Sequence, residues 1–229
     1  MSLQDLLSES FEHDKDLSEL NRIDREKIVY AQLKRNASKH FNKISGGTGR
    51  DVYDFKDNKV IKLAKNEKGI AQNEAEYSMG TDSYIDNVVT QVFYGAENFS
   101  FLISEKAKKV TVGDFKRLVG VDWKYYVDYM EWWGKYLTVS NLRYSPDEEI
   151  IKIIEEKLLE EDNQIYKFKD FIASYDMGQV VGDLTRLSSY GIVQRDYGED
   201  IVLVDYGLTP EVRKMYYDLT RKYELTKPT

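Results

Sequence analysis

The sequence contains no cysteine and only two histidines, His13 and His40, among its 229 residues. Without a thiol the chain has no means of thiol catalysis, disulfide formation or cysteine-based zinc binding. Two histidines also argue against a histidine metal cluster and against a Ser-His-Asp triad. Any chemistry that the chain performs is therefore expected to use aspartate, glutamate, lysine, serine or tyrosine.

Basic residues are in the minority, and long apolar runs are absent. The 33 Lys and Arg residues are outnumbered by 40 Asp and Glu residues, which gives a net charge of −7. This balance argues against a broad cationic face for nucleic acid. No apolar run approaches the ~18 residues that span a bilayer, and the first ten residues lack the basic region of a signal peptide. We expect a soluble protein of the cytoplasm, or of a virion interior, that binds neither nucleic acid nor membrane.

The hydrophobic pattern of the first half predicts an α+β lobe. Residues 1–40 show helical spacing, with Asp24 as a candidate cap, and are expected to form a helical extension. Residues 41–107 read as short strands separated by turns, with one helix over 68–80. The predicted strands are 41–45, 52–55, 60–64, 88–94 and 99–104. Together they predict a five-stranded antiparallel lobe that carries one helix.

The second half, residues 108–229, predicts a reduced and mostly helical lobe. The predicted helices are 121–137, 146–161 and 164–176, followed by short strands at 191–193 and 201–204. Segment 121–137 is strongly aromatic, a pattern more typical of a core or an interface than of a ligand site. Trp132 and Trp133 are adjacent, and neighbours on a helix point ~100° apart. At least one of them is therefore expected to be partly exposed or covered by a partner chain.

Three features of the first lobe suit a bound phosphate. A glycine-rich turn lies between two predicted strands, and the backbone N–H groups of such a turn approach anions closely. It consists of Gly46, Gly47, Thr48 and Gly49. Lys62 lies on the next strand and points away from its apolar neighbours. A glutamate of the following helix, Glu76 in preference to Glu74, is expected to pair with Lys62. Taken singly, the turn is also compatible with a plain hairpin and Lys62 with a solvated lysine.

Three further features lie later in the chain. The apolar strand that ends near Ser104 runs into a polar linker, whose backbone at Glu105 and Ala107 is a candidate for binding a purine. Asp183 follows two apolar residues and suits the orientation or deprotonation of a hydroxyl. Asp205 closes an apolar strand and suits a magnesium ligand. Aspartates also commonly cap strands and turns, so each feature is weak alone.

The order of these features resembles the protein-kinase-like superfamily. In that superfamily a glycine loop covers the phosphates, a strand lysine held by a helix glutamate contacts them, and Asp-Phe-Gly binds magnesium. Val60-Ile61-Lys62 is similar to the lysine motif, and Asp205-Tyr206-Gly207 to Asp-Phe-Gly. Gly182-Asp183-Leu184 resembles the catalytic loop of aminoglycoside-phosphotransferase relatives. Residues 50–73 also look like small kinase-like proteins of bacteria and their phages.

The sequence departs from the superfamily pattern in three places. The asparagine that serves as second metal ligand is replaced by Ser188, whose hydroxyl is a poorer magnesium ligand. The third glycine of the turn is missing, with Asp51 or Val52 at that point, and Asp51 would repel phosphates unless it points away. Because 22 residues (229 − 207) follow Gly207 in this sequence, we expect neither an Ala-Pro-Glu motif nor a helical subdomain that docks a protein substrate.

The resemblance implies two alternative functions. In the first, the chain is an ATP- and Mg²⁺-dependent phosphotransferase with an unknown acceptor. Lys62 contacts the phosphates, Asp205 holds Mg²⁺, Asp183 acts on the acceptor hydroxyl and Ser188 assists the metal or phosphate site. In the second, the chain is a pseudokinase that serves as an interaction or structural module, with segment 121–137 as its contact surface for a partner protein.

Overall fold

The structure, a computed structural model, describes residues 20–138, 145–160 and 163–218. The predicted helical turns before residue 20 lie outside the described residues. The chain divides into two compact units. The sheet unit contains the described residues up to Ser78 together with Val92–Lys106, and the helical unit contains Met79–Gln91 and the described residues from Ala107 onward.

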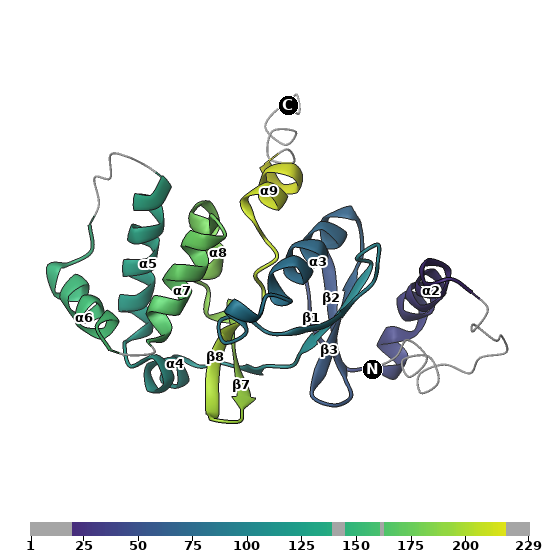
Figure 1. The fold of residues 1–229 in the computed structure, drawn as a ribbon, viewed down its shortest axis with the longest axis horizontal. Helices are drawn as coiled ribbons and strands as arrows, with labels where there is room; N and C mark the ends of the chain where they lie inside the picture. Colours follow the sequence, from purple (N-terminus) through teal and green to yellow (C-terminus); the bar gives the residue numbers. More distant parts are fainter. Residues whose placement is uncertain (1–19, 139–144, 161–162, 219–229) are drawn as a thin grey trace, which may run out of the picture. The chain divides into compact units, whose positions relative to one another are not determined.

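The sheet unit is built on five antiparallel strands, as predicted (Figure 1). The strands are β1 (Lys43–Gly46), β2 (Arg50–Phe55), β3 (Lys59–Ala64), β4 (Val92–Gly95) and β5 (Phe101–Glu105). Their order across the sheet is β1-β2-β3-β5-β4. The fourth strand begins at Val92 rather than at the predicted residue 88, because Val89 instead forms a parallel bridge with Leu203 in the helical unit.

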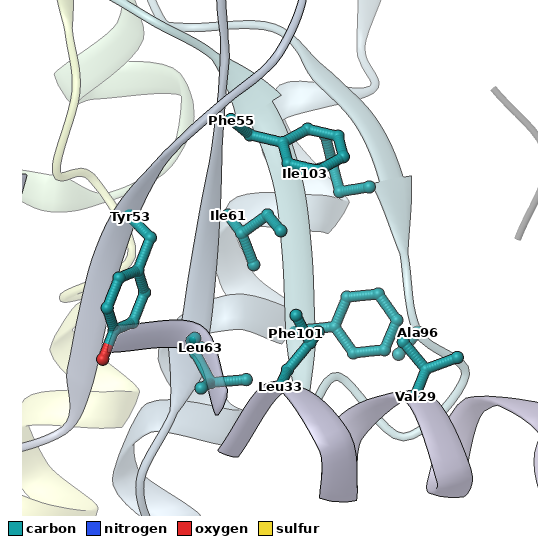
Figure 2. Packing of buried hydrophobic residues seen from close by; sticks show 10 residues of the cluster. Val29, Leu33, Tyr53, Phe55, Ile61, Leu63, Ala96, Phe101 and Ile103 are labelled. Atoms are coloured by element: carbon teal, nitrogen blue, oxygen red, sulfur yellow. The ribbon is translucent and has the colours of Figure 1, made fainter. Parts of the chain in front are cut away.

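Two helices cover opposite faces of this sheet. Alternate residues of β3 point to opposite sides, so Ile61 and Lys62 face different helices. Ile61 packs in a core with Val29 and Leu33 of helix α2 (Arg22–His40), as Figure 2 shows. Lys62 instead meets helix α3 (Glu67–Gly80), which matches the predicted helix 68–80. The apolar pattern of α2, with buried residues four apart, thus reflects packing on the sheet.

Helix α2 begins one turn earlier than its candidate cap implied. The cap is Asn21, whose side chain accepts a hydrogen bond from the backbone N–H of Asp24 at 3.0 Å. Asp24 itself lies in the first turn, where its carboxylate accepts from the Asn21 side chain at 2.9 Å. A carboxylate at this place favours the positive end of the helix dipole, which explains why it resembled a cap in sequence.

A buried carboxylate attaches α2 to the edge of the sheet. Glu26 is only 1% exposed. It accepts hydrogen bonds from Arg22 at 2.7 Å, from the Tyr94 hydroxyl at 2.5 Å and from the Glu97 backbone N–H at 2.7 Å. Burial opposes ionisation, but these donors outweigh it and hold the pKa of Glu26 below its ordinary value.

In its described residues, the helical unit holds four longer helices, several short turns and a small antiparallel sheet. The longer helices are α4 (Val112–Val119), α5 (Trp123–Thr138), α6 (Glu148–Leu158) and α7 (Gln164–Ser174). The short helical segments are η1 (Ser83–Ile85), η2 (Met177–Val180), α8 (Val181–Leu184), η3 (Leu187–Ser189), α9 (Pro210–Arg213) and η4 (Lys214–Asp218). The sheet pairs β6 (Lys108–Lys109), β7 (Tyr190–Arg195) and β8 (Gly198–Leu203) in that order. The predicted α+β class is therefore confirmed.

An aromatic core joins these helices to β7. The Phe115 and Tyr126 rings lie 4.9 Å apart, and the Phe168 and Tyr190 rings lie 5.2 Å apart. The hydroxyls of Tyr126 and Tyr190 are hydrogen-bonded to each other at 2.7 Å. Both phenols are buried, and the bond satisfies polar groups that would otherwise be costly in an apolar core.

The aromatic helix α5 is only partly turned inward. Trp132 and Trp133 are both half-buried, which confirms that the pair does not fit into one core stripe. The Lys169 ammonium lies 5.0 Å from the centre of the Trp133 ring and 5.1 Å from that of Tyr129. None of the helices in the described ranges is long and apolar enough to cross a membrane.

Candidate functional site

The glycine-rich turn joins β1 to β2 and is tight. The backbone N–H of Gly47 donates to the carbonyl of Arg50 at 2.8 Å, which closes the turn. Gly46, Gly47 and Thr48 are exposed, whereas Gly49 is buried. The turn therefore presents three residues to solvent while its base is fixed in the sheet unit.

Residues just before α3 and in its first turn hold the glycine turn by hydrogen bonds. The Lys65 ammonium donates to the Gly47 carbonyl at 2.9 Å, and the Asn66 amide donates to the Thr48 carbonyl at 3.0 Å. The Lys68 ammonium donates to the Thr48 hydroxyl at 3.0 Å. Two lysines thus lie beside an exposed glycine turn, which makes its surroundings electropositive.

Asp51 does not repel an anion in the way that the sequence suggested. Its carboxylate is paired with the Lys43 ammonium at 2.7 Å and lies 3.6 Å from that of Lys65. The two lysines neutralise the charge of Asp51, so this carboxylate adds no net negative charge to the turn.

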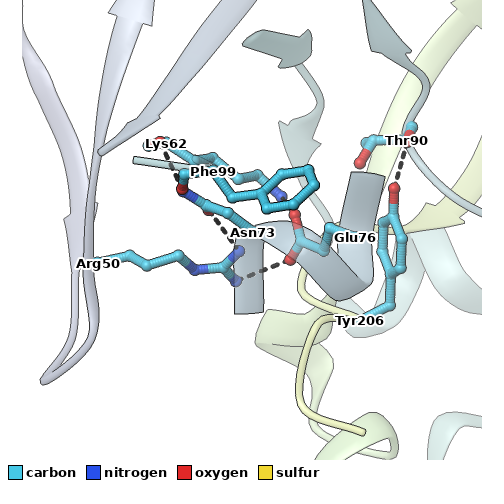
Figure 3. A network of polar contacts seen from close by, with 7 residues as sticks. All are labelled: Arg50, Lys62, Asn73, Glu76, Thr90, Phe99 and Tyr206. Carbon is cyan, nitrogen blue, oxygen red and sulfur yellow. Dashed lines mark hydrogen bonds and ion pairs between the residues drawn. The ribbon is translucent and has the colours of Figure 1, made fainter. Parts of the chain in front are cut away.

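Lys62 and Glu76 form the ion pair that the sequence predicted. The Lys62 ammonium donates to Glu76 at 2.5 Å, and both side chains are buried (Figure 3). Glu74, the alternative partner, is exposed on the other side of α3. A lysine on a central strand is thereby held in one place by a carboxylate from the neighbouring helix.

Sequence reasoning missed Arg50, the second cation of this site. Its guanidinium donates to Glu76 at 2.7 Å and to the Asn73 side chain at 3.3 Å. Asn73 in turn donates to the carbonyl of Phe99 at 2.8 Å, and Figure 3 shows these groups converging on α3. The signal was available in the strand register: Val52 pairs with Lys62, and a residue two positions before Val52 lies on the same face.

The two cations determine the charge of Glu76. Burial alone would raise the pKa of this fully buried carboxyl, but Arg50 and Lys62 outweigh it and lower the pKa below its ordinary value. Glu76 therefore stays ionised, and the group of three carries a net charge of one positive unit.

The linker runs from one unit into the other. Glu105 ends β5 in the sheet unit and is buried, while Ala107 opens the helical unit and is half-buried. Between them, the Lys106 backbone N–H donates to the Asn58 carbonyl at 3.0 Å, and its ammonium pairs with Asp54 at 2.7 Å. The assignment of this linker to a purine stays a prediction.

Asp183 lies in the short helix α8 rather than in an open loop, because the backbone N–H of Thr185 donates to the Val181 carbonyl at 2.8 Å. Its carboxylate pairs with Arg186 at 2.8 Å and lies 3.8 Å from the guanidinium of Arg213. Two arginines therefore contact the predicted catalytic carboxylate.

The predicted residues of the helical unit lie on segments that Ser189 connects. The Ser189 hydroxyl donates to the Asp183 carbonyl at 2.9 Å, and its own carbonyl accepts from the Val204 backbone N–H at 2.8 Å. Ser188, the predicted metal-site residue, is exposed and Ser189 is buried. The pattern of two adjacent serines did not reveal which one faces inward.

Asp205 is exposed just after β8, next to a firmly fixed tyrosine. Tyr206 is buried, and its hydroxyl donates to the Thr90 carbonyl at 2.8 Å. Within the described ranges no group of three or more His, Cys, Asp or Glu side chains is placed to hold a metal ion. Magnesium commonly uses one or two carboxylates and completes its shell with phosphates and water, and an exposed Asp205 fits that use.

Comparison with known proteins gives matches to solved structures only. No family model and no curated protein matches the chain. The chain is similar to the ternary complex of streptomycin, ATP and APH(2″)-IIa, at 13% identity and a TM-score of 0.33, over 79% of this chain and 70% of that one. It is similar to the ADP-bound aminoglycoside phosphotransferase APH(2″)-Ib, at 13% identity and a TM-score of 0.31, over 77% and 69%.

A third match is the GDP and kanamycin complex of APH(2″)-IIia, at 10% identity and a TM-score of 0.35, over 80% of this chain and 73% of that one.

Proposed function

We propose that the chain is a kinase-like phosphotransferase that uses ATP and Mg²⁺ to phosphorylate a hydroxyl-bearing acceptor. The observation that carries the proposal is the buried ion pair between Lys62 of β3 and Glu76 of α3, in a unit whose β1–β2 connection is an exposed glycine turn. A buried ammonium is costly unless it is paired. An ammonium held in one place in this way can bind the negatively charged phosphates of a nucleotide.

The parts of the site would divide the work as follows. Lys62 would contact the nucleotide phosphates, and the turn of Gly46, Gly47, Thr48 and Gly49 would cover them with backbone N–H groups. Glu105 and Ala107 would bind the purine through their backbone. Catalysis would rest on positioning and charge stabilisation rather than on a covalent intermediate.

In the helical unit, Asp205 would hold Mg²⁺ and Asp183 would orient or deprotonate the acceptor hydroxyl. Ser188 offers a neutral hydroxyl, so its contribution to the metal or phosphate site would be small. When bound, Mg²⁺ would neutralise charge that develops on the transferred phosphoryl group. This division predicts at most one tightly held Mg²⁺.

The test combines ATP binding by calorimetry with ATP consumption at millimolar Mg²⁺. Asp205→Asn is expected to abolish Mg²⁺-dependent binding, because the dication loses its charged ligand. Asp183→Asn is expected to leave binding nearly intact and to lower turnover by about 10²–10⁴-fold. Asp196→Asn, which changes an exposed carboxylate of the β7–β8 turn, is the matched control and should change neither. Wild-type protein that neither binds nor consumes ATP would refute the proposal.

One observation favours a second candidate, a pseudokinase that binds nucleotide without transferring phosphate. The Asp183 carboxylate is contacted by Arg186 and Arg213, and an acceptor hydroxyl would have to compete with both guanidinium groups. Segment 121–137 would then serve as a contact surface, since Tyr136 and Leu137 are exposed at its end. Wild-type protein that binds ATP with Mg²⁺ but does not consume it would decide for this candidate.

A further inference from the structure

Glu76 is a buried carboxylate that two cations share. One oxygen accepts from Lys62 at 2.5 Å, and the other accepts from Arg50 at 2.7 Å. Arg50 comes from β2, directly after the glycine turn, whereas Lys62 comes from β3. These are the charged groups that the described residues bring against the Glu76 carboxylate, and Asn73 adds a neutral amide beside Arg50.

A lysine that must serve a phosphate poses a problem for its partner. When the Lys62 ammonium binds a phosphate, it neutralises less of the negative charge of the Glu76 carboxylate. A buried carboxylate without a cation is strongly destabilised and takes up a proton instead. A neutral Glu76 would then no longer position the lysine, and nucleotide binding would be linked to proton uptake.

We propose that Arg50 is a positioning residue that keeps Glu76 ionised while Lys62 engages the nucleotide phosphates. The inference rests on the proposed nucleotide-binding function and concerns a residue outside the predicted set. Arg50 acts through Glu76, because its guanidinium can stay bonded to that carboxylate while Lys62 binds the phosphates. Its second bond, to Asn73 at 3.3 Å, fixes the guanidinium against α3.

The position of Arg50 also ties this effect to the glycine turn. Its backbone carbonyl accepts from the Gly47 N–H and closes the turn, while its side chain binds Glu76. One residue therefore connects the exposed phosphate-binding turn with the buried ion pair. A displacement of the turn would reach Glu76 through a single side chain.

The experiment measures proton uptake on nucleotide binding. The full chain is titrated with Mg²⁺-ADP by calorimetry, between pH 5.5 and 8, in two buffers of different ionisation enthalpy. The wild type is expected to bind without uptake at Glu76. Arg50→Gln is expected to weaken binding by about fivefold to a hundredfold at pH 7.5, to lose less at pH 5.5, and to take up a proton. Protonation of the ADP phosphates is common to all variants and cancels in their differences.

Two further variants assign the proton and guard against misfolding. In Arg50→Gln combined with Glu76→Gln the extra uptake should vanish, because an amide does not titrate. If Arg50→Gln does not fold, Arg50→Lys is titrated in the same way. Its proton uptake is expected to lie between that of wild type and that of a protein with a neutral side chain at this position. Lys34→Gln removes one exposed cation from α2 and should behave as wild type.

The outcomes separate the two proposals. If Arg50 has only a structural role, Arg50→Gln or Arg50→Lys will lower thermal stability but leave proton uptake equal to that of wild type. This result would overturn the inference about Arg50 and leave the proposed nucleotide binding untouched. Wild-type protein that does not bind Mg²⁺-ADP or Mg²⁺-ATP would refute the nucleotide-binding function, and the inference with it.

Discussion

The backbone of Gly69 lies close to that of Gly49 at the base of the glycine turn, and this contact predicts that a side chain at Gly69 destabilises the protein. This residue is the third of α3, and it packs against the base of the turn. A Cβ added there would lie 2.0 Å from the carbonyl oxygen of Gly49, 2.9 Å from its carbonyl carbon and 3.1 Å from the Cα of Ala64. All three atoms belong to the backbone, so no flexible side chain can move aside.

The magnitude follows from two opposing effects. Alanine is a better helix former than glycine by about 1 kcal/mol, and Gly69 does not have a positive φ that alanine would resist. Forcing an extra methyl group into a packed region costs about 1–3 kcal/mol, and a backbone contact this short belongs at the upper end. We expect Gly69→Ala to destabilise the protein by about 2 kcal/mol, or roughly 4–8 °C in Tm for a chain of this size.

Gly113 provides the matched control. It is the second residue of α4, and a Cβ there would meet only the Thr111 hydroxyl, at 3.8 Å. Gly113→Ala should therefore keep the gain in helix propensity and stabilise its own unit by up to about 1 kcal/mol. Urea unfolding followed by circular dichroism measures both variants. The reasoning would be wrong if Gly69→Ala were as stable as wild type or more stable, or if the two substitutions shifted stability in the same direction.

Three other substitutions test the buried polar groups. Glu76→Gln should cost about 3–5 kcal/mol in urea unfolding, because two buried cations lose their counter-ion, while Glu74→Gln on the exposed side should stay within about 0.5 kcal/mol. Wild-type stability should fall as pH drops below about 4.5, because Glu26, whose folded pKa is lowered, stabilises the fold only while ionised; Glu26→Gln should flatten that slope. Tyr126→Phe should cost about 1 kcal/mol by thermal melting, because the Tyr190 hydroxyl loses its partner, and an unchanged Tm would contradict this.

The sheet unit was predictable because its strands and turns carry local signals. Alternating residues and the glycine turn each restrict a few neighbouring residues. The turn between β2 and β3 does the same, because its residues Asp57 and Asn58 have positive φ. The packing of α2 on the face of the sheet opposite α3 was not predictable in the same way. The spacing of Val29, Leu33 and Ala37 indicates an apolar helix face but does not name the surface that this face covers.

The helical unit shows where local signals stop. Adjacent residues such as Ser188 and Ser189 have nearly the same local preference, and their burial is set by a distant strand through the bond from Val204 to Ser189. In the same way, nothing near Asp183 in sequence indicates Arg213, which reaches it from α9. Such pairings depend on how separate segments meet, which composition and period do not encode.

The choice between Glu74 and Glu76 shows what decides a buried site. The two residues are about 200° apart on a helix, so only one of them can face the sheet, and spacing alone does not say which. Rotation of α3 is fixed by what else must be buried on that face: Asn73 is fully buried and bonds the backbone of Phe99. Asn73 reads as a surface residue in sequence, yet it is Asn73 together with Arg50 that holds Glu76 opposite Lys62. A polar network of this kind can be predicted only once the strand register is known, because the hydrogen-bond partners of its residues come from different helices and strands.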